Sequence, residues 1–123
     1  MTMVATRQLG AALSFIAFFA FAVTAPLSAD EPPLPTFPKR TLYSEARTAL
    51  LALGYQPVHL PDADTCDPRY DASRCFPERE ACAGTGMAPC NFVWRRAERV
   101  IVVGTIGDEM PIVTGVRCLS GCP

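Results

Sequence analysis

Apolar positions recur at helical spacing over Thr41 to Leu53, and this is the clearest periodic element of the chain. One stripe of the predicted helix carries Leu42, Ala46, Ala49, Leu50 and Leu53. Thr41, or alternatively Ser44, can cap its first turn with a hydroxyl. Gly54 is well placed to end the helix in the left-handed conformation.

Shorter apolar segments after this helix predict strands. Tyr55 to Leu60 alternates but contains Pro57, which cannot donate to a ladder, so we expect an edge strand. Three further strands are predicted at 91–95, 99–106 and 111–118, and the short turns between them favour an antiparallel meander. The sequence therefore predicts an α+β fold, with one N-terminal helix packed on a small antiparallel β-sheet.

The same periodicities predict which side chains form the core. Phe92 and Trp94 share one face of their strand, and we favour a buried Trp94 over an exposed partner-binding one. Ile112, Val116 and Cys118 are expected on a common face. The residues predicted to be largely buried are Phe92, Trp94, Val100, Val102, Ile112 and Val116, together with Leu50 and Leu53 of the helix.

The longest apolar run, Leu9 to Val23, precedes all of these elements. Arg7 lies before it and Pro26 to Ala29 follow it, which is the pattern of a secretory signal. We expect residues 1–29 to be removed after Ala29, with cleavage after Ala25 as an alternative. A retained membrane anchor is the competing interpretation. A Pro-rich, extended lead-in at 30–40 would follow, and a single disulfide-stabilised domain at 41–123.

The exported part has a nearly balanced charge, since removal of Arg7 leaves ten cations against twelve acids. Such a balance gives no electrostatic footprint for nucleic acid, and it provides no strong attraction to an anionic membrane. We therefore expect no nucleic-acid partner and no stable membrane insertion once the signal is cleaved.

Six cysteines, an even number, all lie in the exported part. In a small exported domain they indicate a disulfide framework rather than a zinc site, because no pair has the two-residue spacing of common zinc ribbons and His59 is the only histidine. Proximity favours Cys66–Cys75, Cys82–Cys90 and Cys118–Cys122, whereas a bridge such as Cys90–Cys118 would close a longer loop. Both patterns remain open from the sequence.

The long polar segment from Pro61 to Pro77 is the candidate partner-contact loop. Its acids also suggest calcium, but Cys66 interrupts the EF-hand pattern and no glutamate closes it, so we expect a solvated loop and no metal. A helical turn is predicted at 77–83. Gly84-Thr85-Gly86 is more typical of a turn than of a phosphate cradle, and we expect no cofactor. The candidate contact residues of the loop are Asp62, Asp64, Asp67, Arg69, Tyr70 and Asp71.

Four short segments together resemble small, uncharacterised exported cysteine-containing proteins of proteobacteria. They are Gly54-Tyr55-Gln56-Pro57-Val58, the stretch from Cys82 to Cys90, Phe92-Val93-Trp94 and Val116-Arg117-Cys118. The resemblance covers about residues 41–118. It implies a periplasmic or secreted location and transfers no active-site residue.

Three functional classes remain open from the sequence. We favour a non-enzymatic exported module that binds a protein or an envelope component. A small secreted inhibitor or host-directed effector would use a rigid, exposed loop such as Pro61 to Pro77. A hydrolase is the least favoured class, because His59 is the only imidazole and no serine lies in a recognisable nucleophile elbow, although Asp62 and Asp64 follow His59.

Overall fold

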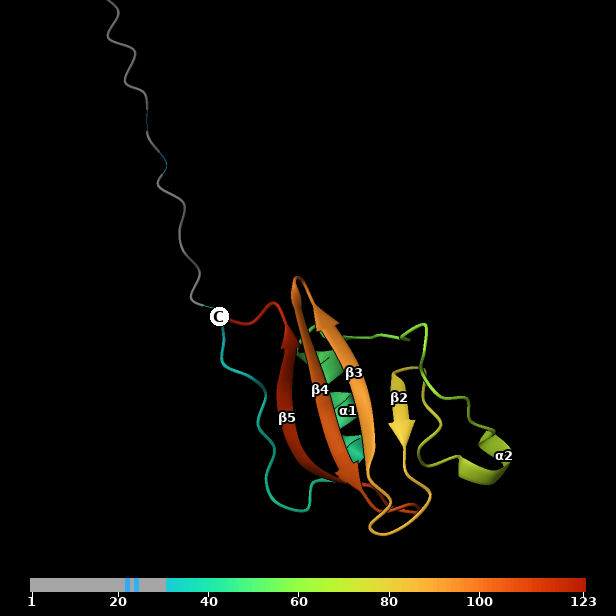
Figure 1. The fold of residues 1–123 in the computed structure, drawn as a ribbon. Coiled ribbons are helices and arrows are strands. Elements are labelled where there is room, and N and C mark those ends of the chain that lie inside the picture. Colours follow the sequence, from blue (N-terminus) through green and yellow to red (C-terminus); the bar gives the residue numbers. More distant parts are fainter. Residues whose placement is uncertain (1–21, 23, 25–30) are drawn as a thin grey trace, which may run out of the picture. The chain divides into compact units, whose positions relative to one another are not determined.

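A single helix, α1, lies behind a twisted antiparallel sheet in the computed structural model (Figure 1). The structure describes Ala22, Thr24 and residues 31–123, and Glu31–Pro123 is a compact unit. The predicted signal at 1–29, with its cleavage site, lies outside the described residues except for Ala22 and Thr24. The elements are α1 (Tyr43–Ala52), β1 (Gln56–Pro57), α2 (Pro68–Asp71), β2 (Arg79–Cys82), β3 (Cys90–Arg96), β4 (Arg99–Ile106) and β5 (Ile112–Ser120).

The sheet has the order β1-β3-β4-β5, and β2 also pairs with β3. All pairs are antiparallel, so the predicted meander of β3, β4 and β5 and the edge position of β1 are confirmed. The helical turn predicted at 77–83 is wrong, because Arg79–Cys82 is the strand β2. Pairing with β3 satisfies backbone groups that an isolated helical turn of this length would leave unpaired.

The two ends of α1 differ in how well the sequence predicted them. Gly54 has φ +84°, and the amides of Gly54 and Tyr55 donate to the carbonyls of Leu51 and Leu50, as in a Schellman motif. The predicted caps are wrong: the Glu45 carboxylate accepts from the amide of Leu42, the observed N-cap residue. The Thr41 hydroxyl instead donates to the carbonyl of Pro38.

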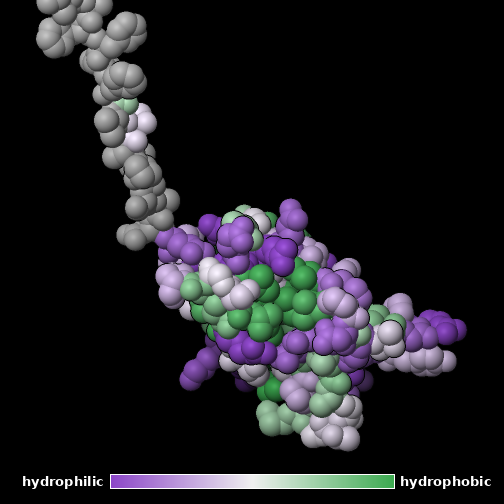
Figure 2. Space-filling view, turned by 45° about the horizontal axis from the view of Figure 1, so that its top comes forward, coloured by the Kyte–Doolittle hydropathy of each residue, from purple (hydrophilic) through white to green (hydrophobic). Residues whose placement is uncertain are grey.

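Both faces of the sheet carry apolar side chains. The helix side forms the larger cluster, whose buried members are Tyr43, Leu50, Tyr55, Cys90, Phe92, Trp94, Ile101 and Val103. The opposite side buries Val93, Val100 and Val102 beneath Val58 and Leu60. Figure 2 shows an apolar area on the molecular surface, bordered by polar residues.

Burial agrees with the sequence prediction in the centre of the sheet and departs from it at the margins. Phe92, Trp94, Val100, Val102 and Leu50 are buried as expected. Leu53 is 49% exposed, because it is the C-cap residue and lies beyond the face that α1 packs on the sheet. Ile112 and Val116 are only half-buried, since they lie on the edge strand β5.

A bulge in β5 explains why the predicted common face of Ile112, Val116 and Cys118 is wrong. Gly104 pairs with Gly115, but the next residue, Thr105, pairs with Val113. The extra residue reverses the alternation, so Val113, rather than Ile112, packs with Val116 against the core.

The three disulfides join Cys66 to Cys75, Cys82 to Cys90 and Cys118 to Cys122, which is the local pattern favoured by proximity. Cys82 and Cys90 are also cross-strand partners of β2 and β3, so this bridge reinforces their pairing. The longer Cys90–Cys118 alternative is not formed.

The proline-rich lead-in runs alongside the domain and contacts it at several points. Leu34 and Phe37 pack against the helix-side core. The Glu31 carboxylate lies 2.6 Å from Nε of Arg99, and the guanidinium of Arg99 also donates to the carbonyl of Pro33. The lead-in is therefore part of the packed structure from Glu31 onward.

Candidate functional site

The candidate contact loop, residues 61–77, connects β1 to β2 and projects away from the sheet, with α2 at its far end (Figure 1). The Cys66–Cys75 disulfide closes it. The short helix starts with Pro68, whose fixed φ suits a first helical position, and the carboxylate of Asp67 accepts from the amide of Arg69 at 2.9 Å.

Arg79 of β2 holds this loop against the sheet. Its Nε donates to Asp64 and one terminal nitrogen donates to Asp71, both at 2.7 Å. Asp64 also accepts from the amide of Cys82 at 2.9 Å, and Asp71 also accepts from Nε of Arg74 at 2.7 Å. We call Asp64, Asp71, Arg74 and Arg79 the loop clamp.

The charges of the loop clamp are fixed by their neighbours. Burial alone would raise the pKa of Asp64 and of Asp71, but hydrogen bonds from their arginine partners hold both pKa values below the ordinary value of 3.8. Burial likewise opposes the charge of Arg79, and the two carboxylates nevertheless raise its pKa. Asp64, Asp71 and Arg79 therefore carry their charges at neutral pH.

The six predicted contact residues divide into three groups. Asp64 and Asp71 point inward as members of the loop clamp, where they accept hydrogen bonds from Arg79. Asp62 is exposed. The side chain of Arg69 is 78% exposed, and Tyr70 is 85% exposed. Asp67 caps α2 and forms an ion pair with Arg69 at 2.6 Å, which lowers the pKa of Asp67 and raises that of Arg69.

Arg69 and Tyr70 form the exposed tip of the loop. The guanidinium carbon of Arg69 lies 5.5 Å from the centre of the Tyr70 ring, within the range of a cation–π contact. An aromatic ring with its hydroxyl and a planar cation thus lie side by side in solvent, on a segment whose base is fixed.

A buried polar network lies beneath the return of the loop to β2. The carboxylate of Glu78, fully buried, accepts from the Tyr43 hydroxyl and from Nε of Arg47, each at 2.7 Å. The indole of Trp94 donates to the Tyr43 hydroxyl at 3.1 Å. Burial, followed by the charge of Glu78, raises the pKa of Tyr43 far above its ordinary value, so this phenol stays protonated.

Sequence reasoning missed this network. Tyr43 and Arg47 are four residues apart and therefore share a face of α1, a spacing that could have been noticed. Glu78 gave no such signal, because an acid in a charged stretch beside a proline normally indicates a solvated position.

The hydrolase hypothesis depended on His59, and its surroundings do not assemble a catalytic relay. His59, Asp64 and Thr65 line one cavity of about 360 Å³. However, both oxygens of Asp64 are held by Arg79, and Nδ1 of His59 lies 3.3 Å from the carbonyl of Pro77. Within the described residues, His59 has no hydrogen bond to an acid or a hydroxyl that would make it a general base.

The remaining sequence motifs have structural explanations in the part of the chain that the structure describes. No group of three or more histidine, cysteine or acidic side chains there is arranged to hold a metal ion. Gly86 has φ +66° in the turn between β2 and β3, where the amide of Ala88 donates to the carbonyl of Thr85.

Neither helix of residues 31–123 has the length and apolar character that crossing a bilayer requires.

No protein-family model, curated protein or solved structure matches this chain. The resemblance to exported proteobacterial proteins accordingly stays a prediction.

Proposed function

We propose that this chain is an exported, non-enzymatic binding module that recognises a protein or an envelope component through the tip of loop 61–77. The observation that carries the proposal is the exposed pair Arg69 and Tyr70 on a loop whose base is fixed by a disulfide and by the loop clamp. Tyrosine and arginine are the residue types enriched in the energetic centres of protein interfaces.

The rigidity of the loop supports recognition in physical terms. A flexible loop loses conformational entropy when it binds, and this cost is subtracted from the contact energy. Here the Cys66–Cys75 disulfide and the carboxylate–arginine hydrogen bonds restrict the loop in the free protein. Three disulfides are also typical of proteins from oxidising compartments, which agrees with export.

The helical conformation of α2 separates general binding from substrate-like protease inhibition. An inhibitor that mimics a substrate offers an extended segment to the active-site cleft and usually adds to a strand. Arg69 and Tyr70 instead lie within a helical turn, with the amides of Tyr70 and Asp71 donating to the carbonyl of Asp67. An effector or inhibitor role therefore requires docking on the surface of its target.

Site-specific photo-crosslinking tests the proposal. A photoreactive phenylalanine replaces Tyr70 in the oxidised protein, which is then exposed to native envelope and secreted fractions. The control carries the same group in place of Leu51, an exposed residue of α1. We expect one discrete adduct from position 70 and none from position 51.

Alanine substitutions make the test quantitative. If Tyr70 and Arg69 are central contacts, Tyr70→Ala should weaken binding to the captured partner by about thirtyfold, equivalent to about 2 kcal/mol. The thermal midpoint should not change, because Tyr70 is 85% exposed. Equal adducts at both positions, or full binding by Tyr70→Ala, would contradict the proposal.

A further inference from the structure

The outer side of β5 is a free sheet edge. β5 pairs with β4 on one side, and on the other its beginning meets the chain before α1. There the amide of Val113 donates to the carbonyl of Thr41 at 2.9 Å, and Leu42 forms an isolated bridge with Ile112. Among the described residues, no segment pairs with residues 114–120 on this outer side.

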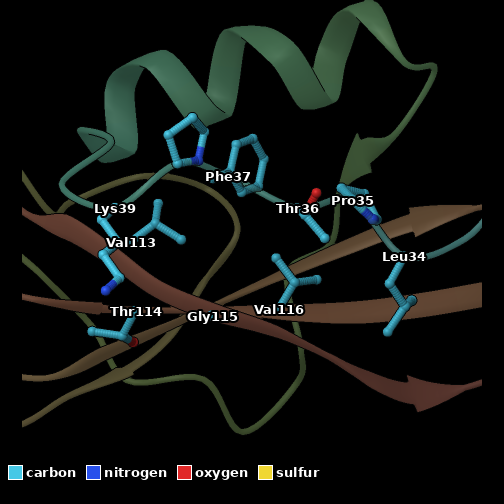
Figure 3. Close-up of a pocket in the computed structure, with 10 residues that line it drawn as sticks. Leu34, Pro35, Thr36, Phe37, Lys39, Val113, Thr114, Gly115 and Val116 are labelled. Atoms are coloured by element: carbon cyan, nitrogen blue, oxygen red, sulfur yellow. The ribbon is translucent and has the colours of Figure 1, made fainter.

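The lead-in follows this edge but does not close it. Its prolines lack the amide donors of a strand, and its apolar side chains Leu34 and Phe37 turn towards the core instead. A groove of about 410 Å³ remains between residues 34–39 and residues 113–116 of β5 (Figure 3). Its apolar lining includes Leu34, Val113 and Val116.

The exposed charge along the β5 edge is positive. Lys39 lines the groove and Arg40 is the next residue, whereas Arg117 is exposed on the other face of β5, since its cross-strand partner is Val102. None of these three cations forms an ion pair within the described part of the chain. The acid of the lead-in, Glu31, is held by Arg99, so it does not neutralise them.

We propose that the β5 edge is a second binding site, which takes an extended, acidic segment of a partner protein as an additional strand. Main-chain hydrogen bonds to β5 would supply affinity, and alternate side chains of the segment would face the apolar groove. Carboxylates of the segment would pair with Lys39, Arg40 and Arg117. A second copy of this chain fits less well, because β5 carries Arg117 and no acid, so two β5 strands would bring like charges together.

The test uses a synthetic peptide, acetyl-Glu-Val-Thr-Val-Glu-Val-Asp-amide, and the oxidised full chain. Binding is measured by calorimetry, and hydrogen exchange locates it. We expect the amides of residues 114–120 to gain protection, while those of loop 61–77 do not change. A peptide of the same charge with its central valine replaced by proline should bind at least tenfold more weakly, because a ladder donor is lost.

Charge reversal provides the matched control. Lys39→Glu should weaken binding by about fivefold, since one attraction becomes a repulsion. Arg95→Glu, which changes an exposed arginine on β3, should leave binding unchanged apart from a small long-range effect. Equal weakening by both variants would indicate net charge alone and overturn the proposal. Protection outside β5, or a dimer formed through β5 in ultracentrifugation, would also overturn it.

The inference does not depend on the proposed function of loop 61–77. Tyr70→Ala should bind the acidic peptide with unchanged affinity. If crosslinking at position 70 succeeds while the peptide fails to bind, only the β5 site is disproved.

Discussion

Replacing Arg79 with methionine removes the cation that holds the candidate contact loop to the sheet. Arg79→Met keeps an apolar side chain of similar length, so it removes the charge and the hydrogen bonds while retaining much of the volume. In the native protein the Arg79 side chain is 9% exposed and forms ion pairs with Asp64 and Asp71. We expect the loop to detach from β2 while the Cys66–Cys75 disulfide still closes it.

The expected loss of stability follows from the burial of the partners. Removing one member of a buried ion pair costs about 3–5 kcal/mol. Here Asp71 is 18% and Asp64 is 34% exposed, so water screens part of the interaction. The Cys82 amide and Arg74 would remain as donors to the two carboxylates. A loss of about 2 kcal/mol is therefore reasonable, which corresponds to a fall in Tm of about 10 °C for a domain of this size.

Urea unfolding with the disulfides intact measures the loss, and hydrogen exchange locates it. Amides of residues 61–77 should exchange faster in Arg79→Met, whereas those of β3 and β4 should exchange only as fast as global unfolding allows. Arg69→Met is the matched control, because it removes an arginine–aspartate pair that is mostly in solvent. The control should leave the unfolding midpoint unchanged.

Two results would refute this reasoning. A Tm of Arg79→Met within about 2 °C of the parent would mean that the clamp contributes little to folding. An unchanged exchange rate in the loop would mean that the disulfide alone fixes it. In the second case the rigidity argument would rest on Cys66–Cys75 and not on the ion pairs.

Three further predictions concern the core, acid stability and export. Trp94→Ala should cost about 3–5 kcal/mol in urea unfolding, because the side chain is fully buried, and a near-unchanged midpoint would contradict a core role. The pKa values of Asp64 and Asp71 in the folded protein lie below 3.8, so the unfolded chain takes up protons at a higher pH than the folded chain does. The stability that these two groups contribute should therefore be complete well above pH 3.8 and decline as pH falls through 3.8. Rising stability below that pH would show the sign to be wrong. Intact mass of exported material should place the mature start at Asp30, and an uncleaved chain in a membrane fraction would refute this.

The elements that the sequence predicted well are those determined by local periodicity. The range of β4 agrees with the prediction at both ends, and α1 differs by two residues at its start and one at its end. The pairing of cysteines that are close in sequence was also predicted, because closing a short loop between two cysteines costs little conformational entropy. In each case the residues that determine the helix, the strand or the disulfide lie close together in the sequence.

The errors have a common physical origin in contacts between distant residues. The roles of Asp64 and Asp71 depend on Arg79, which reaches them only when β2 pairs with β3. Nothing in the segment 77–83 reveals this pairing, since its own composition suits a turn. The burial of Glu78 likewise depends on Tyr43, which lies 35 residues earlier in the chain.

The two proposed sites have a shared topological cause. β1 and β2 both pair with the same side of β3, so the chain between Pro57 and Arg79 must leave that edge and return to it, and it projects as the contact loop. At the opposite edge, the prolines of the lead-in cannot complete a ladder with β5, so a groove stays open there. The pairing of the first strand with β3 continues to Val58, whose amide donates to the carbonyl of Val93, and it stops there because the amide of Val93 donates instead to the carbonyl of Glu78. Since β4 and β5 separate β3 from the groove, substitutions at one site should not perturb the other, and additivity of the Tyr70 and Lys39 variants is the expected consequence.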